Sequence, residues 1–433
     1  FSSRRRHTRY ISVTGVQTCA LPICGLGQRM STGSKGIARP TIEIANTGEK
    51  HIIDGVEMEF VYVLDTEAPV EIMVWLPQLK AFCTAEDMTH NMHNLQTLRG
   101  AKVRNGLLWS KAIDTAIERY GDQVEVSFST HHWPTWGNER IVDYWEAQRD
   151  MYRYLHDQTL HLANRGLTPD EIAEEMKLPA SLASQFNCRG YYGTLSHNVK
   201  AQYDLYFGWF NGNPAHLNPL PPSELGSKYV EAIGGADKVL EVAKASYAKG
   251  EYRWVATLLD NLVFAEPENK EARRLLADTY TQLGYQAESG PWRNFYLTGA
   301  RDLFKKDVPY TSQLINDGVL AQMDMGTLLD YCAIQLNGEK AAGKEAVINI
   351  NFTDTKEKVM LMLNNGVLNH RLDSQDEKAD LTLEIEKMDF IKLFFGRTDL
   401  QTLLKTNKVR TTGNTQAMDV IRSEEHTSEL QSH

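Results

Sequence analysis

The sequence predicts a multidomain α+β protein, and three observations lead to this fold class. Residues 41–131 alternate short apolar runs with turn residues, and residues 143–302 place apolar residues at helical spacing. Residues 308–421 return to strand-like segments. The length of 433 residues corresponds to two to four domains at about 150 residues per domain.

The first region is expected to form a layered α/β domain. Apolar runs bounded by turn residues predict strands at 56–64, 71–77 and 124–130. Residues 105–121 are expected to form a helix, because four apolar residues recur there at helical spacing: Leu108, Ala112, Ala116 and Ile117. The order strand, strand, helix, strand is typical of a layer of helices on a sheet.

The second region is expected to be entirely helical and to contain a repeat. Ala243 and Ala277 lie 34 residues apart, as do Gly250 and Gly284. The segment AKGEYRWVATLLDNLVFAEPEN, with Pro267, has the helix–turn–helix–proline layout of a tetratricopeptide (TPR) unit. Such helix pairs stack to bury apolar faces, so packing or dimerisation is favoured over peptide recognition.

The third region is expected to be an α+β sandwich with a four-stranded meander. Helices are predicted at 323–336, 387–396 and 400–405, and strands at 345–350, 358–363, 366–372 and 379–385. This arrangement resembles the sterol-carrier (SCP2)-like fold, whose interior can hold an acyl chain. Gly413-Asn414, near the last strand, adds weak support for that resemblance.

Composition limits the function classes. The formal net charge of −10 argues against nucleic acid as a partner. No apolar run approaches the ~18 residues of a transmembrane helix. Cys83, Cys188 and Cys332 are scattered, which fits neither a disulfide framework nor a cysteine-based metal site.

The two ends of the chain differ from the rest. Residues 1–24 and 422–433 resemble translated sequencing-adapter read-through of the kind that flanks reading frames in raw metagenome assemblies. The protein sequence itself is therefore expected to be cut at both ends. Its domains are expected at 25–142, 143–305 and 306–421.

The side chains that could carry chemistry concentrate in residues 65–135. They are Glu67, Glu86, His90, His93, His131 and His132. Carboxylates and imidazoles brought together from separate strand ends suit Zn²⁺ or a similar divalent ion, although their spacing alone does not decide this. The two glutamates could also form a glycosidase acid/base pair, but nothing else in the chain supports a sugar site.

Four blocks in this region together resemble a linear alkylsulfatase of the metallo-β-lactamase superfamily. The blocks are Thr66-Glu67-Ala68-Pro69, Ala85-Glu86, His93-Asn94-x-x-Thr97-Leu98-Arg99-Gly100 and His131-His132-Trp133-Pro134-x-Trp136-Gly137. The resemblance covers residues 25–421. It implies a partial metallo-β-lactamase αβ/βα domain at 25–142, a helical TPR-like dimerisation domain at 143–305 and an SCP2-like domain at 306–421.

The resemblance also implies site residues and a cofactor. In that family two zinc ions are held by a His-x-His-x-Asp-His motif, two glutamates and a later histidine. The metal ligands implied here are Glu67, Glu86 and His131. Asn94 and Arg99 are implied to bind the sulfate group, which the planar guanidinium fork of arginine suits. Tyr192 and Trp133 are expected to line the substrate site.

The chain departs from the family pattern in one respect, since its 433 residues contain no His-x-His-x-Asp-His. The parent protein is expected to be a homodimeric, periplasmic or secreted zinc enzyme that hydrolyses alkyl sulfates such as dodecyl sulfate. The chain as given is expected to be inactive, because it holds half of the metal site. The alternative is a non-enzymatic lipid-binding or scaffold protein built on the TPR-like and SCP2-like domains.

Three further histidines have expected roles that differ from metal binding. His90 is expected to orient a neighbour or face solvent. His93 is expected to hydrogen-bond a ligand carboxylate from behind. His132 is expected to point away from His131, because successive side chains in a strand alternate between faces.

Overall fold

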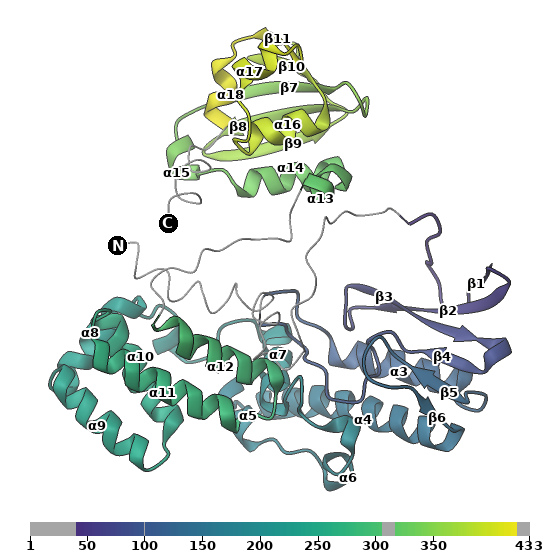
Figure 1. The fold of residues 1–433 in the computed structure, drawn as a ribbon, viewed down its shortest axis with the longest axis vertical. Coiled ribbons are helices and arrows are strands. Elements are labelled where there is room, and N and C mark those ends of the chain that lie inside the picture. Colours follow the sequence, from purple (N-terminus) through teal and green to yellow (C-terminus); the bar gives the residue numbers. More distant parts are fainter. Residues whose placement is uncertain (1–39, 99, 305–316, 422–433) are drawn as a thin grey trace. The chain divides into compact units, whose positions relative to one another are not determined.

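The computed structural model describes residues 40–98, 100–304 and 317–421, and the chain divides into two compact units (Figure 1). Unit 1 contains the described residues from 42 to 304, and unit 2 contains those from 317 to 421. The terminal segments 1–24 and 422–433, which resemble adapter read-through, lie outside the described residues. In the described part of the chain, no helix is long and apolar enough to span a membrane.

Unit 1 begins with a six-stranded sheet whose strands lie in sequence order. The strands are β1 (Lys50–Ile53), β2 (Val56–Leu64), β3 (Val70–Leu76), β4 (Ala81–Cys83), β5 (Val126–Phe128) and β6 (Thr135–Trp136). All neighbours pair antiparallel except β4 and β5, which are parallel. A parallel pair needs a crossover connection, and the helix α3 (Gly106–Tyr120) lies in that connection.

The sequence of α3 explains its start and its buried face. The Asn105 side chain accepts hydrogen bonds from the amides of Leu107 and Leu108, which caps the helix. The residues buried at helical spacing are Trp109, Ile113, Ala116 and Tyr120. They pack with the long helix α4 (Asn138–Ala163), whose Tyr152 ring stacks on Trp109 with centroids 4.6 Å apart.

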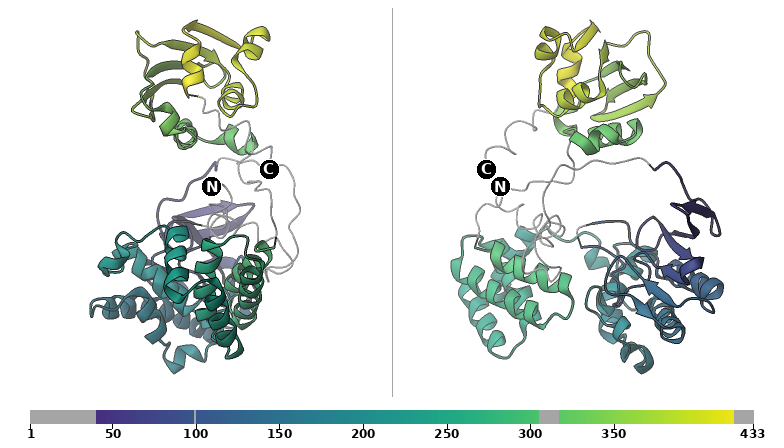
Figure 2. Two further views of the ribbon diagram at one scale, coloured as in Figure 1. Left: turned by 90° about the vertical axis from the view of Figure 1, so that its left-hand side faces the viewer. Right: turned by 45° about the vertical axis from the view of Figure 1, so that its right-hand side comes forward.

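Helices form the rest of unit 1. Three follow α4: α5 (Pro169–Glu175), α6 (Ala180–Ala183) and α7 (Leu195–Phe207). Five more form a stack of their own beside the strand-containing part of the unit (Figure 2): α8 (Pro222–Ile233), α9 (Ala236–Ala248), α10 (Tyr252–Ala265), α11 (Lys270–Gln286) and α12 (Gly290–Asp302). Short 3₁₀ helices lie at η1 (Pro77–Leu79), η2 (Phe186–Cys188) and η3 (Pro214–His216).

The predicted 34-residue repeat is found only in part. Ala243 in α9 and Ala277 in α11 are both buried, as a repeat of helix pairs requires. The two glycines are not equivalent, because Gly250 lies in the turn before α10 with φ +79°, whereas Gly284 lies within α11. Gly226 in α8 has a role outside the repeat. A Cβ there would lie 2.4 Å from the carbonyl oxygen of Asn261 in α10, so glycine permits the close contact of these helices.

Unit 2 is a five-stranded sheet with helices, and its topology corrects the predicted four-stranded meander. The strands are β7 (Ala346–Phe352), β8 (Lys358–Asn364), β9 (Val367–Leu372), β10 (Leu381–Ile385) and β11 (Val409–Gly413), in the order β11-β10-β7-β8-β9. Only β7, β8 and β9 form a meander, because β10 crosses back to pair parallel with β7. The strand β11 was not predicted, since its short sequence VRTTG has no apolar alternation.

The helices of unit 2 enclose an apolar core. They are α13 (Asp317–Gln322), α14 (Met325–Ile334), α15 (Gly338–Ala341), α16 (Lys387–Phe394), α17 (Leu400–Lys405) and α18 (Gln416–Ile421). Three phenylalanines lie at the centre of this core, with Phe352 and Phe394 packed against the fully buried Phe390. Unit 2 therefore has an interior of its own.

Candidate metal centre

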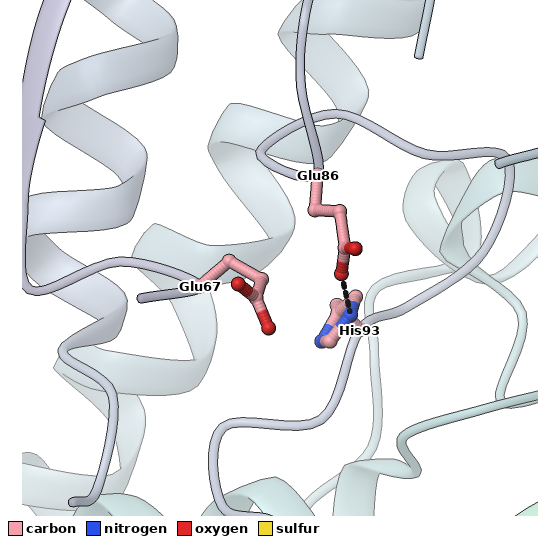
Figure 3. Close-up of side chains that lie close together, drawn as sticks. All are labelled: Glu67, Glu86 and His93. Atoms are coloured by element: carbon pink, nitrogen blue, oxygen red, sulfur yellow. Dashed lines mark ion pairs between the residues drawn. The ribbon is translucent and has the colours of Figure 1, made fainter. Parts of the chain in front are cut away.

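Two carboxylates and one imidazole meet next to the unit 1 sheet, from the β2–β3 turn and from the segment between β4 and α3. Glu67 lies in the turn between β2 and β3, and Glu86 follows β4. His93 lies in the irregular segment 84–105 that leads to α3. Their potential ligand atoms all lie within 4.8 Å of one another (Figure 3), with His93 Nε2 3.4 Å from Glu86 Oε2.

The carboxylate of Glu86 lies between two imidazoles. The second is that of His131, whose Nε2 lies 3.1 Å from Glu86 Oε1 and whose side chain is 56% exposed. The hydrogen bond from His93 and the attraction of Glu86 to the imidazoles of His131 and His93 in their protonated forms outweigh the effect of burial and lower the pKa of Glu86 to about 2. Glu86 is therefore an anion at physiological pH.

A buried guanidinium, which the sequence analysis did not single out, holds this cluster together. Arg104 pairs with Glu67 Oε1 and also donates to the Glu67 carbonyl oxygen at 2.5 Å. Its Nη1 donates to the backbone carbonyl of Asn94 at 2.8 Å and to Asn94 Oδ1. Arg104 belongs to none of the four sequence blocks. It lies 37 residues after Glu67 in the chain, so only the folded structure shows that the two side chains meet.

Arg104 also decides the tautomer of His93. Its Nη1 lies 3.1 Å from His93 Nδ1, and a guanidinium can only donate. His93 Nδ1 is therefore the acceptor, and Nε2 carries the proton that it donates to Glu86. This geometry favours a role for His93 in orienting the Glu86 carboxylate. To bind a metal ion at Nε2, the imidazole would have to give up the proton that Nε2 carries.

Two more carboxyl groups, those of Glu71 and Asp87, lie next to the cluster, and the sequence analysis did not single them out. Asp87 is fully buried, and Glu71 on β3 accepts a hydrogen bond from the Glu86 amide at 3.0 Å. Burial raises the pKa of Glu71 to about 7, reinforced by the charges of Glu67 and Glu86. Burial and the charge of Glu71 raise the pKa of Asp87 well above its usual range. Protonation of these groups limits the negative charge that collects next to Glu67 and Glu86.

The donor set suits a divalent cation. Carboxylate oxygens and imidazole nitrogens are ordinary ligands of Zn²⁺. Glu67 and Glu86 cluster with His93, and the exposed His131, which the sequence analysis named as a ligand, contacts Glu86. Arg104 takes up one oxygen of Glu67, which leaves the other for a cation. The residues present therefore fit a metal ion in their chemistry.

The structure brings two of the other predicted site residues close to this cluster. Asn94 is buried and contacts Arg104, and the ring of Tyr192 lies 4.9 Å from that of His93. The exposed ring of Trp133 lies 4.9 Å from His90 and 6.3 Å from Phe186. Arg99 lies outside the described residues.

One expectation about the histidines is wrong. His132 was expected to alternate with His131 along a strand, but β5 ends at Phe128 and His132 has a left-handed φ of +67°. Its Nε2 lies 3.2 Å from Asn91 Nδ2. His90 contacts Thr135, with 3.0 Å between Nε2 and Oγ1, and burial lowers its pKa.

Comparison with known proteins decides the family. Residues 168–306 match the family model for alkyl sulfatase dimerisation, and residues 313–423 match that for the alkyl sulfatase C-terminal region. A linear primary-alkylsulfatase from Pseudomonas sp. (strain ATCC 19151) is 31% identical over 401 residues, which cover 90% of this chain and 75% of that protein. The chain belongs to the alkylsulfatase family.

Other alkylsulfatases are more similar in sequence. A linear primary-alkylsulfatase from Pseudomonas sp. is 45% identical over 401 residues, covering 92% of this chain and 59% of that protein. The solved structure of a stereoselective inverting sec-alkylsulfatase from Pseudomonas sp. has 39% identity and a TM-score of 0.89, covering 97% of this chain and 67% of that one. The chain spans 57–60% of the length of three of the curated relatives that it matches.

The boundary between the two family models follows the boundary between the units of this alkylsulfatase chain, but the dimerisation model begins inside a core of unit 1 that continues to Tyr203. The dimerisation model covers α5 to α12 of unit 1, and the C-terminal model covers unit 2. The candidate metal centre precedes both matches, on the sheet and on the segment between β4 and α3. Helix α4, which the sequence analysis placed in the helical domain, also precedes the first match.

Proposed function

We propose that the parent of this chain is a zinc-dependent hydrolase of alkyl sulfate esters, which converts ester and water to alcohol and inorganic sulfate. One observation carries the proposal: in a chain of the alkylsulfatase family, Glu67 and Glu86 lie close together with His93, and His131 contacts Glu86 with 3.1 Å between Nε2 and Oε1. Glu67, Glu86 and His131 would hold the metal. The bound metal would supply Lewis-acid activation of a water molecule.

Asn94 is proposed to bind the sulfate group, and Arg104 orients it for that role. Because Arg104 donates to Asn94 Oδ1, the amide is turned so that its Nδ2 serves as the donor toward an anion. Arg99 is proposed to pair with the same group through two parallel hydrogen bonds. An acidic protein needs this local cationic site, since its net charge of −10 repels an anionic substrate.

The remaining proposals concern the rest of the substrate and the state of this chain. Tyr192 is proposed to contact the substrate, and unit 2 is proposed to have the SCP2-like fold. Without a His-x-His-x-Asp-His motif, we propose that the 433 residues bind metal weakly and do not turn over substrate. The alternative of a non-enzymatic lipid-binding or scaffold protein rests on the SCP2 resemblance alone.

Fusing the chain to the upstream part of the 45% identical linear primary-alkylsulfatase tests the proposed activity. We expect the fusion to release sulfate from dodecyl sulfate with zinc present and to stop after chelation. Glu86→Gln in the fusion should lower metal affinity about 10- to 100-fold, as losses around metal ligands do. The matched control is Glu57→Gln, because Glu57 lies on β2 and forms a solvent-accessible ion pair with Lys50 on β1.

The unfused chain should release no sulfate under the same conditions. Full activity of the chelated fusion, or two tightly bound metals per chain in Glu86→Gln, would reject the zinc site. Equal turnover by the unfused chain would reject its proposed inactivity.

We further propose that the parent is a homodimer that uses the end of α7 and the segment leading from it to α8. Within the range that matches the dimerisation model, Phe207 at the end of α7 and Trp209 and Leu217 in that segment are exposed, with Trp209 72% exposed. Exposed aromatic patches mark protein interfaces. Sedimentation should show a dimer that Phe207→Ser with Trp209→Ser converts to monomer, whereas Tyr285→Ser, an equally exposed aromatic on α11, should leave the dimer intact. A dimer that survives the double substitution would place the interface elsewhere.

A further inference from the structure

The described residues of the segment between β4 and α3, 84–98 and 100–105, form no regular helix or strand, yet many of them are buried. Met88, Met92 and Leu95 are fully or almost fully buried. Buried backbone amides and carbonyls need hydrogen-bond partners, and an irregular segment cannot supply them from its own helix or sheet. Besides hydrogen bonds within the segment, such as that from the Arg104 amide to the Leu95 carbonyl at 2.8 Å, its shape therefore depends on groups that bond to its backbone from outside.

Helix α7 supplies several of these groups, and Asn198 makes the most specific contact. The side-chain Oδ1 of Asn198 accepts from the Leu95 amide at 2.8 Å, while its Nδ2 donates to the His93 carbonyl at 2.9 Å. One fully buried amide thus binds the backbone on both sides of Asn94, as a neighbouring β-strand would. It fixes the two peptide groups that determine where the Asn94 side chain points.

Gln202 repeats this contact one helical turn later. Its Oε1 accepts from the Gly106 amide at 3.0 Å, and its Nε2 donates to the Arg104 carbonyl at 2.9 Å. Gln202 is also fully buried, and the four-residue spacing places both amides on the same face of α7. The backbone is therefore held next to Asn94 and again next to Arg104.

His197 adds a third contact and connects it to α12. Its Nε2 lies 2.7 Å from the Gln96 carbonyl, and its Nδ1 accepts from Trp292 Nε1 at 3.1 Å. The two contacts require the neutral tautomer with the proton on Nε2. Burial lowers the pKa of His197, which is consistent with that form.

We propose that Asn198 and Gln202, assisted by His197, are positioning residues that hold Asn94 and Arg104 in the geometry needed to bind a sulfate group. The proposal rests on the proposed function for the anion and on the geometry above for the positioning. According to this proposal, α7 controls the shape of the segment between β4 and α3, although the bonded residues lie 96 to 105 positions apart in the chain.

Amide hydrogen exchange of the chain as given tests the contacts without any substrate. Asn198→Ala should accelerate exchange at Leu95 at least about tenfold and leave Gly106 within about twofold, and Gln202→Ala should do the reverse. Thr279→Val, at another fully buried polar position in α11, should accelerate neither. Unchanged Leu95 exchange in Asn198→Ala, or equal acceleration throughout unit 1, would overturn the assignment.

Asn198→Asp keeps the test decisive even where the alanine variant does not fold. A carboxylate still accepts from the Leu95 amide but cannot donate to the His93 carbonyl. Leu95 should therefore stay protected in Asn198→Asp. Loss of that protection in a folded Asn198→Asp protein would contradict the contact that we assign.

Titration with inorganic sulfate, followed by NMR at the Asn94 side-chain amide, tests the purpose of the positioning. Asn198→Ala should weaken sulfate binding about tenfold relative to the native chain, whereas Thr279→Val should not change it. Equal affinity in Asn198→Ala and the native chain would reject the positioning role. If the native chain bound no sulfate, the proposed anion site would fail, while hydrogen exchange would still decide whether α7 holds the segment.

Discussion

Arg104 shows how one buried charge organises the residues around it. A buried guanidinium needs acceptors on several sides, and here Glu67, Asn94 and His93 provide them. In return the contact determines which atoms of Asn94 and His93 are donors. The chemistry available at the candidate metal centre therefore depends on a residue that is itself not a candidate ligand.

Glu71 provides a pH-dependent prediction at the same scale. Its folded-state pKa is raised from 4.5 to about 7, so the folded chain binds the proton more tightly than the unfolded chain. The resulting cost to stability is absent below about pH 4.5 and grows as the pH rises to about 7. In metal-free buffer, Glu71→Gln should stabilise unit 1 at pH 8 by on the order of 2 kcal/mol, with no gain at pH 4.

Urea unfolding of both proteins across this pH range measures the difference. The amide of Gln can still accept the hydrogen bond from the Glu86 backbone, so that contact is kept. Glu57→Gln, at a partly exposed ion pair with Lys50, is the control for the loss of a carboxylate elsewhere on the sheet. A pH-independent difference between Glu71→Gln and the native chain would show that Glu71 is not a raised-pKa group.

At the level of elements, the turn at residues 189–193 forms backbone hydrogen bonds with the segment between β4 and α3. The Met92 amide donates to the Arg189 carbonyl at 2.9 Å, and the Gly193 amide donates to the Met92 carbonyl at 2.9 Å. A Cβ at Gly193 would lie 2.4 Å from the His93 carbonyl oxygen, which is backbone and cannot rotate away. Glycine is therefore required at position 193, because any side chain would collide with the His93 carbonyl.

Gly193→Ala should destabilise unit 1 by about 1–3 kcal/mol, the usual cost of an overpacked site, and should displace His93. Gly190→Ala is the matched control, because the nearest atom to its added Cβ would be 3.4 Å away. Chemical denaturation measures the stabilities, and the His93 ring resonances report its position. Equal stability of the two variants would show that the turn relaxes to accept a side chain.

Elements with a strong periodic pattern were predictable, and elements without one were not. The strands at 56–64 and 358–363 and the helix at 105–121 were found within one residue at each end, because each buries a face along its length. The short strands β1, β4, β6 and β11 were missed. They form because a neighbouring strand pairs with them, and two to five residues are too few for a pattern.

At the scale of the whole chain, the two units have separate interiors. The buried core of unit 2 consists of residues from the described range 317–421 alone, and the two cores of unit 1 consist of residues from 61 to 303. Because each unit has an apolar core built from its own residues, each is expected to unfold cooperatively. Mutations should therefore act on one unit at a time.

Calorimetry of paired variants tests this independence. Phe390→Ala in unit 2 should lower the stability of that unit by about 3–5 kcal/mol, because a fully buried phenylalanine is removed. Leu259→Ala, at a fully buried position in α10, should lower only the transition of unit 1 by about 2–5 kcal/mol. If each substitution shifted both transitions equally, the units would unfold as one.

The sequence by itself determined the family, the order of strand-rich and helical regions, and the candidate ligands Glu67, Glu86 and His131. These follow from local patterns and short blocks of residues, which need no knowledge of distant contacts. The roles of the ligands remain predictions.

The tertiary structure alone decided which distant residues act on those candidates. Arg104 meets Glu67 across 37 residues, His131 meets Glu86 across 45, and Asn198 meets the His93 carbonyl across 105. A single buried hydrogen bond depends on distance and orientation in the folded chain. It leaves no periodicity in the sequence, so only the fold could show that α7 holds the segment that carries Asn94.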